Sequence, residues 1–340
     1  PVPAAPVGRT YLAPPPELDR YVSCRREQTV NLFGDELTVS ASPFMAQDAQ
    51  LLRCAHATLW VCGQLHSAME QTTTILPSDV AAAVPSELGI GRPVPSVGLT
   101  IHQISAAATR LGFPPLVYDL SSGLPGNESL FKIACRYLNS GIPVIVAGGG
   151  HAFVLVGYLR TDPQTPDERI QFIRQDDEVG PYQVVANCLL DIYSPWQFLV
   201  IPLPRKVFMA GEDAEVVGSI RLEAALNADG FQAPPSGWSW RSTLLKSNDF
   251  KTQLSARGVP DREATIYRRT HMSRWIWVVE AVDRSLRDAG EPAHAAAAGN
   301  GAGAARLGQA PVRVGRAEPE VARHRHLHAR DLVGSLATDA

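Results

Sequence analysis

The sequence predicts an α+β fold in which helices come first and an antiparallel sheet follows. Three segments between residues 48 and 140 are predicted helices: the first repeats apolar residues every three or four positions, and each of the others ends before a glycine. From residue 143 to 201 the pattern changes to short apolar runs, bounded by glycine or proline. Strands that follow helices and are mostly joined by short turns indicate an antiparallel sheet packed against those helices.

The composition allows a sizeable core. Of 340 residues, 45% are hydrophobic and 19% are charged. We expect an N-terminal arm with a short hairpin over residues 1–43, an α+β core over 44–205 and an α/β extension over 206–289. The Ala-, Gly-, Arg- and His-rich sequence of residues 290–340 has no period and is expected to be disordered.

The elements are predicted in chain order as follows. In the arm, the apolar runs 29–33 and 37–39 flank a Gly-Asp turn at 34–35, which predicts a hairpin. The first helix covers 48–69, with Asp48 as N-cap and one apolar face; a loop-rich region follows to residue 95. The other two helices cover 99–111 and 128–140 and end at Gly112 and Gly141. Strands are expected at 143–147, 151–158, 170–173 and 198–201, a helix at 212–227, and a strand followed by helix formers at 274–287.

Charge, hydropathy and cysteine content exclude several classes of function. A net charge of −3 gives no electrostatic basis for binding nucleic acid or an anionic membrane, and no apolar run approaches the roughly 18 residues that span a bilayer. The start of the chain lacks the basic and apolar regions of a secretory signal, so we expect a cytoplasmic protein. The five cysteines contain no CxxC pair, which argues against a zinc ribbon and favours buried free thiols.

Cys54 is the candidate nucleophile. A nucleophilic thiol reacts as its thiolate, which a helix N-terminus stabilises, and Cys54 lies in the first turns of the predicted helix. Ala55 and Ala57 leave its surroundings uncrowded. Gln47 and Gln50 lie just upstream, where a side-chain amide can donate to a developing oxyanion.

His151 and an aspartate complete the candidate site. His151 begins a buried strand directly after three glycines, which allow another backbone or a substrate to come close. A base at the end of a rigid strand stands at the edge of a cleft. Asp176 or Asp177, at the end of the next strand, can accept a hydrogen bond from the imidazole and fix its tautomer.

The order Cys54, His151, Asp176 resembles the papain-like cysteine peptidases, especially the bacteriocin leader-processing peptidases and their bacterial relatives. The resemblance covers about residues 44–205. It implies a papain-like core with Cys54 as nucleophile, His151 as base, Asp176 as orienting group and Gln47 as oxyanion donor. Asp176 stands four residues before Gly180, as in those peptidases, which favours it over Asp177. Gln47 is seven residues before Cys54 where six is usual, so Gln50 or a backbone group is an alternative donor.

The expected function is a thiol hydrolase that cleaves a peptide or protein substrate through an acyl-enzyme, without a cofactor or metal. Two alternatives use the same residues: an acyltransferase of the transglutaminase-like or arylamine acetyltransferase-like type, and an inactive papain-like binding module, which a thiol far from the His151 ring would favour. A metal site at Cys54, His56 and His66 is geometrically poor, because positions 54 and 56 face different sides of a helix. The glycines before His151 lack the Lys-Ser/Thr of a phosphate loop.

Overall fold

The computed structural model describes residues 8–46, 54–84, 98–123, 129–160, 170–185, 196–228, 238–255 and 261–283. The chain forms two compact units, residues 1–205 and 206–340. Three predictions fall outside the described residues: the helix cap at Asp48, the glutamines Gln47 and Gln50, and the tail after residue 290.

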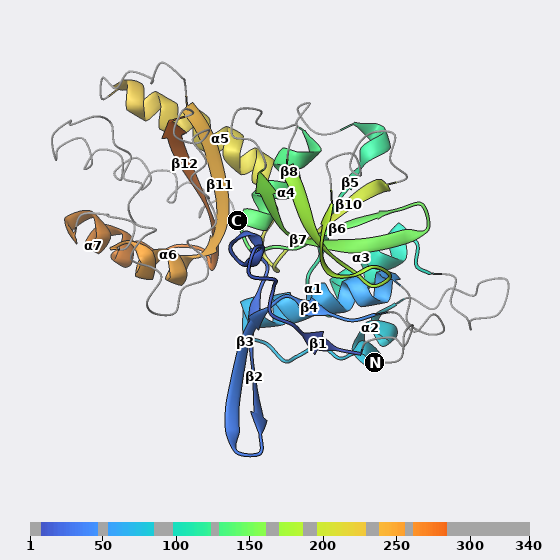
Figure 1. Cartoon of the computed structure of the whole chain (residues 1–340). Coiled ribbons are helices and arrows are strands. Elements are labelled where there is room, and N and C mark those ends of the chain that lie inside the picture. Colours follow the sequence, from blue (N-terminus) through green and yellow to red (C-terminus); the bar gives the residue numbers. More distant parts are fainter. Residues whose placement is uncertain are drawn as a thin grey trace. The chain divides into compact units, whose positions relative to one another are not determined.

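A six-stranded antiparallel sheet forms the centre of unit 1 (Figure 1), and with the helices beside it confirms the predicted α+β class. Every neighbouring pair of strands is antiparallel. In sheet order the strands are β5 (Pro115–Asp119), β10 (Trp196–Pro202), β6 (Val144–Gly148), β7 (His151–Arg160), β8 (Ile170–Asp176) and β9 (Gly180–Val185). The sequence prediction missed both edge strands. Each begins at or next to a proline and exposes a valine, Val117 in β5 and Val184 in β9, which weakens the apolar signal.

Among its described residues, unit 1 has four α-helices: α1 (Cys54–Glu70), α2 (Pro77–Ala83), α3 (Ile101–Leu111) and α4 (Leu130–Asn139). Both α1 and α4 pack against β7, whereas α3 packs against β5 and β10. Gly112 ends α3 in the left-handed conformation, as predicted. The helix α2 was not predicted; it lies in the region expected to be loop-rich and begins with Pro77, and Asp79 accepts a hydrogen bond from the Leu76 N–H at 2.8 Å.

The helix α1 differs from its predicted one-sided apolar pattern. Every residue from Ala55 to Ser67 is buried, including His56, Gln64 and His66. The reason is that β7, β4, α2, α3 and β2 all contact this helix. Its polar side chains are therefore held by hydrogen bonds; Gln64, for example, accepts from Tyr11 Oη at 2.9 Å and from Arg26 Nη1 at 2.8 Å.

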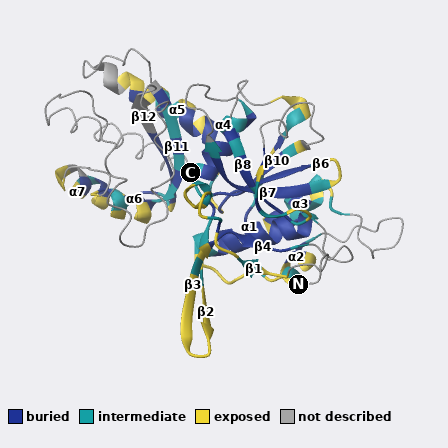
Figure 2. Ribbon diagram, in the orientation of Figure 1, coloured by how far each residue is buried: buried dark blue, intermediate teal, exposed yellow. Residues whose placement is uncertain are grey.

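The N-terminal arm belongs to unit 1. Its strands β1 (Thr10–Tyr11) and β4 (Pro43–Phe44) pair with each other, and β2 (Arg26–Leu32) pairs with β3 (Asp35–Ala41) in the predicted hairpin. The turn of that hairpin is Phe33–Gly34, one residue earlier than predicted, because both residues take the positive φ that a two-residue hairpin turn requires. Most of the hairpin is exposed (Figure 2).

The arm touches the sheet at Gly157 of β7. The backbone N–H groups of Ser23 and Cys24 donate to the Val156 carbonyl, each at 3.0 Å. A Cβ on Gly157 would lie 2.1 Å from the Tyr21 carbonyl oxygen, so only glycine allows this approach.

Unit 2 contains two long antiparallel strands, β11 (Trp238–Lys246) and β12 (Trp275–Asp283), with α5 (Gly211–Ala228) packed against both. The short helices α6 (Ser247–Gln253) and α7 (Asp261–Arg269) connect the strands in sequence. A core cluster joins α6, α7 and β12: Phe250, Leu254, Ala264, Tyr267, Met272, Ile276 and Val278. The sequence has helix formers after Val279, but the strand continues to Asp283, because pairing with β11 keeps these residues extended.

Candidate active site

Cys54 is the first residue of α1 and is half-buried. The N–H groups of the first turn of a helix have no partner within the helix, so they can stabilise negative charge next to this thiol. Cys24, Cys62 and Cys135 are free and buried, as expected of packing residues. Burial raises the pKa of Cys24 to about 12, and burial and the neighbouring Cys24 raise that of Cys62. Among the cysteines that the structure describes, Cys54 is the one with partial access to solvent.

His151 is the first residue of β7, and a tight turn places it there. Gly148 of β6 pairs with His151, and Gly149 and Gly150 between them have φ values of +57° and +83°. These glycines therefore make a two-residue hairpin turn. A Cβ on Gly150 would have no atom within 4 Å, so the expected close approach of another backbone does not occur at Gly150.

The His151 ring joins the thiol to a buried carboxylate. His151 Nε2 lies 3.1 Å from Asp176 Oδ1, and the Cys54 side chain forms a hydrogen bond with the same ring. Burial lowers the pKa of His151, but the hydrogen bonds and negative charges of Asp176 and Cys54 outweigh it and raise the pKa to about 10. The ring is therefore an imidazolium at neutral pH.

Asp176 is the last residue of β8 and its side chain is 1% exposed. The backbone N–H of Glu178 donates to Oδ1 at 3.0 Å, and Arg174 Nη1 lies 3.0 Å from Oδ2. Burial raises the pKa of Asp176, but His151, the Glu178 N–H and Arg174 together lower it by more, so its pKa lies below the ordinary value. An ionised carboxylate held in this way can fix the orientation of the imidazole.

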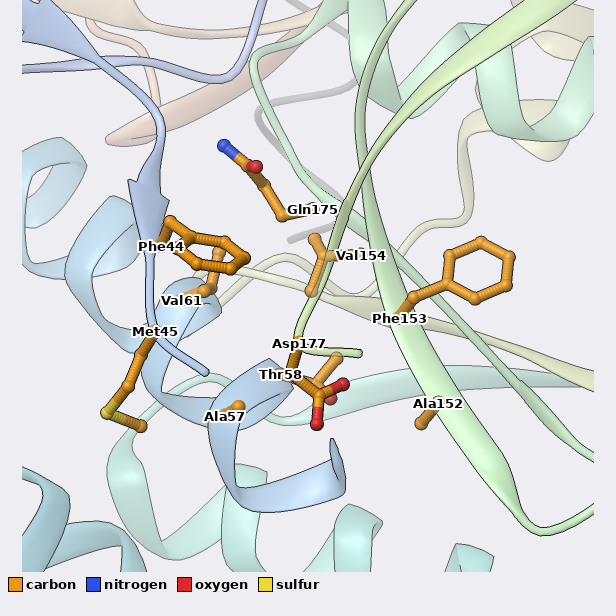
Figure 3. Close-up of a pocket in the computed structure, with 10 residues that line it drawn as sticks. All are labelled: Phe44, Met45, Ala57, Thr58, Val61, Ala152, Phe153, Val154, Gln175 and Asp177. Atoms are coloured by element: carbon orange, nitrogen blue, oxygen red, sulfur yellow. The ribbon is translucent and has the colours of Figure 1, made fainter. Parts of the chain in front are cut away.

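The structure brings Asp176, and not Asp177, to the His151 hydrogen bond. Asp177 instead lines a pocket between α1 and the sheet (Figure 3). Burial raises the pKa of Asp177 to about 6, although the nearby His151 lowers it. The two adjacent aspartates therefore lie in different surroundings and differ in charge state below neutral pH.

Sequence reasoning missed three residues around this group. Arg174 lies two residues before Asp176 on β8, and this spacing places both on one face of the sheet. The Arg174 guanidinium also lies 4.9 Å from the centre of the Phe153 ring. Phe44 of β4 and the following Met45 line the pocket, although they are far from β7 and β8 in sequence, so no local pattern could have identified them.

The oxyanion donor predicted at Gln47 or Gln50 lies outside the described residues. Gln175 faces the pocket, but its side chain holds other groups: Oε1 accepts from the Tyr182 N–H at 3.0 Å, and Nε2 donates to the Ser42 carbonyl at 3.4 Å.

One group of described residues has donor atoms close enough to share a metal ion: His151, Asp176 and Asp177, whose atoms lie within 4.8 Å of one another. A metal here would compete with the His151–Asp176 hydrogen bond and with the Arg174 ion pair. His66 takes no part in such a group, because its Nε2 lies 2.7 Å from the Pro202 carbonyl oxygen and its ring stacks on Phe113. Burial lowers the pKa of His66 to about 4, which marks it as a neutral core residue.

Comparisons with protein-family models, with curated proteins and with solved structures found no match. None of the described helices is both long and hydrophobic enough to cross a bilayer.

Proposed function

We propose that this protein is a papain-like thiol hydrolase that forms an acyl-enzyme on Cys54. The observation that carries the proposal is the His151 ring, which is hydrogen-bonded both to the Cys54 side chain and to the Asp176 carboxylate. This is the arrangement of nucleophile, base and orienting group that covalent acyl transfer requires. The positions of the thiol at a helix start and the histidine at a strand start add support.

The proposed reaction has two steps. The Cys54 thiolate attacks a carbonyl carbon, and N–H groups at the start of α1 stabilise the oxyanion. The His151 imidazolium gives its proton to the departing amine, which leaves a thioester on Cys54. Neutral His151 then takes a proton from water, the water oxygen attacks the thioester, and the acid product leaves as the thiol regains its charge. Asp176 accepts from Nε2 throughout.

The geometry weighs against the inactive-module alternative, for which a thiol far from the His151 ring is expected. An acyltransferase would form the same thioester, and an amine rather than water would resolve it. Incubation of a thioester-forming substrate with and without a primary amine separates these two outcomes, because the amide product appears only when the amine intercepts the acyl group.

The test is the rate at which iodoacetamide alkylates Cys54, followed by mass spectrometry of its peptide between pH 5 and 10. We expect rapid alkylation of the parent protein at pH 6.5 and slow alkylation of His151→Ala. An ordinary thiol is about 1% ionised at that pH, so the difference is expected to be roughly 10- to 100-fold after allowing for the lower nucleophilicity of a stabilised thiolate. Equal rates in the two proteins at pH 6.5 would overturn the proposal.

A further inference from the structure

The two oxygens of the Asp176 carboxylate have different partners. Oδ1 lies 3.1 Å from His151 Nε2, and it accepts from the backbone N–H groups of Glu178 at 3.0 Å and Val179 at 3.4 Å. Oδ2 lies 3.0 Å from Arg174 Nη1. One buried carboxylate is therefore shared between two cations, the imidazolium of His151 and the guanidinium of Arg174.

The contact between Arg174 and Asp176 acts through charge rather than through a hydrogen bond. Neither Asp176 Oδ2 nor Arg174 Nε has a hydrogen-bond partner among the described residues, although Nη1 is within ion-pair distance of Oδ2. The described hydrogen bonds that orient the carboxylate reach Oδ1 instead. Removal of the guanidinium is therefore expected to leave Asp176 in place and to change mainly the electrostatic field around it.

An aromatic ring holds the guanidinium beside the sheet. Arg174 Cζ lies 4.9 Å from the centre of the Phe153 ring, and the Arg174 side chain is 15% exposed. Phe153 and Val154 point to opposite sides of β7 (Figure 3), and the period of two along the strand places Phe153 on the same side as His151. An arginine stays protonated at any pH at which a histidine titrates, so its charge acts on Asp176 throughout.

The groups that interact with the His151 ring are acidic. They come from α1, from β8 and from the turn after β8: Cys54, Asp176, Asp177 and Glu178. The sequences of β4, β6 and β9 contain no Asp, Glu, Lys, Arg or His, and α4 and the arm reach β7 at Tyr158 and Gly157, toward its other end. These acidic groups hold the proton of the ring tightly, and Arg174 offsets the charge of one of them.

We propose that Arg174 is a positioning residue whose charge weakens the attraction of Asp176 for the His151 imidazolium, which then gives up a proton to the leaving amine more readily. This inference rests on the function proposed above. In that step the C–N bond breaks, the nitrogen keeps the electron pair and takes the proton, and the acyl group stays on the Cys54 sulfur. A general acid is most effective when its pKa lies near the working pH, so a cation that loosens the proton favours the step.

The test is a titration of His151 by NMR in the full-length chain, labelled with carbon-13 histidine. All proteins carry Cys54→Ala, which removes the hydrogen bond and the charge of the thiol and so lowers the pKa of His151 from its value of about 10. The Cε1–Hε1 signal of His151 is assigned by its absence from His151→Gln. Arg174→Met removes the charge and keeps a long side chain against Phe153, whereas Arg174→Lys keeps the charge.

We expect the titration midpoint of His151 to rise by about one pH unit in Arg174→Met, because Asp176 then acts on the ring without a competing cation. Arg174→Lys is expected to titrate close to the protein with arginine. With Cys54 present, the alkaline limit of peptide hydrolysis should move to higher pH in Arg174→Met. A purely structural role predicts the opposite sign, because a displaced Asp176 would lose its hydrogen bond to His151 and the midpoint would fall.

A midpoint that falls or stays in Arg174→Met would overturn the inference, as would an equal rise in Arg174→Lys. If thermal unfolding shows that Arg174→Met does not fold, Arg174→Gln makes the same comparison with a polar side chain. The titration requires neither the thiol nor an acyl-enzyme. Its outcome is therefore separate from the iodoacetamide test, in which equal rates would overturn the proposed function itself.

Discussion

Replacing Asp176 by asparagine tests how the buried carboxylate acts on His151. The substitution keeps the shape of the side chain, but it removes the charge that lies 3.1 Å from His151 Nε2 and 3.0 Å from Arg174 Nη1. At 3.1 Å, and with an effective dielectric constant of 20, the attraction between the two charges is about 5 kcal/mol. The His151 side chain is 17% exposed, so solvent screens part of this energy.

The expected consequence is a lower pKa for His151 in Asp176→Asn. Loss of an opposite charge at this distance lowers it by about 1–3 from its value near 10. The imidazolium is the proton donor to the leaving amine, so the rate falls as the pH rises through this pKa. The alkaline limit of hydrolysis therefore moves to lower pH in Asp176→Asn, and kcat at neutral pH is expected to fall roughly 10²- to 10⁴-fold as the imidazole loses its fixed tautomer.

The assay is a pH profile of Cys54 alkylation and of peptide hydrolysis, measured from pH 5 to 10.5 in the parent and in Asp176→Asn. Glu36→Gln serves as the control for removal of one negative charge. An alkaline limit that stays at the same pH in Asp176→Asn would refute the role given to this carboxylate, even if the overall rate fell.

Three further predictions concern stability. The raised pKa of His151 contributes stability that is fully present below about pH 6.5 and is lost as the pH approaches 10. The parent protein should therefore exceed His151→Gln in urea unfolding free energy at low pH. This difference should shrink over that range by at most about 1.4 kcal/mol per pH unit. Gly157→Ala forces the arm from β7 and should lower the unfolding free energy by about 1–3 kcal/mol or more. Gly8→Ala, whose added Cβ meets no atom within 4 Å, should change the unfolding free energy little. Equal effects of the two substitutions would contradict the close approach at Tyr21. Gly150→Ala strains the turn before His151 and should cost about 1–2 kcal/mol, measured by thermal or urea unfolding; no loss would contradict the positive φ assigned there.

The choice between Asp176 and Asp177 shows where local pattern stops being informative. The period of two along β8 predicts that Arg174 and Asp176 share one face and that Asp177 takes the other, but not which face meets His151. That outcome depends on strand register. The pairing of β7 with β8 shifts between Leu155 and Gly157, and the pairing of β8 with β9 shifts between Arg174 and Asp176. A one-residue shift exchanges the faces, and it arises from contacts between strands.

The sequence alone determined the features that depend on neighbouring residues: the helix that contains Cys54, the glycines and apolar strands around His151, the arm hairpin and the α+β class. These follow from backbone preferences and from apolar periodicity. Tertiary structure alone decided which carboxylate contacts His151, that β4 and α1 enclose a pocket with Asp177, and that α1 is buried on all sides. Each of these depends on contacts between residues far apart in the chain, which no local pattern encodes.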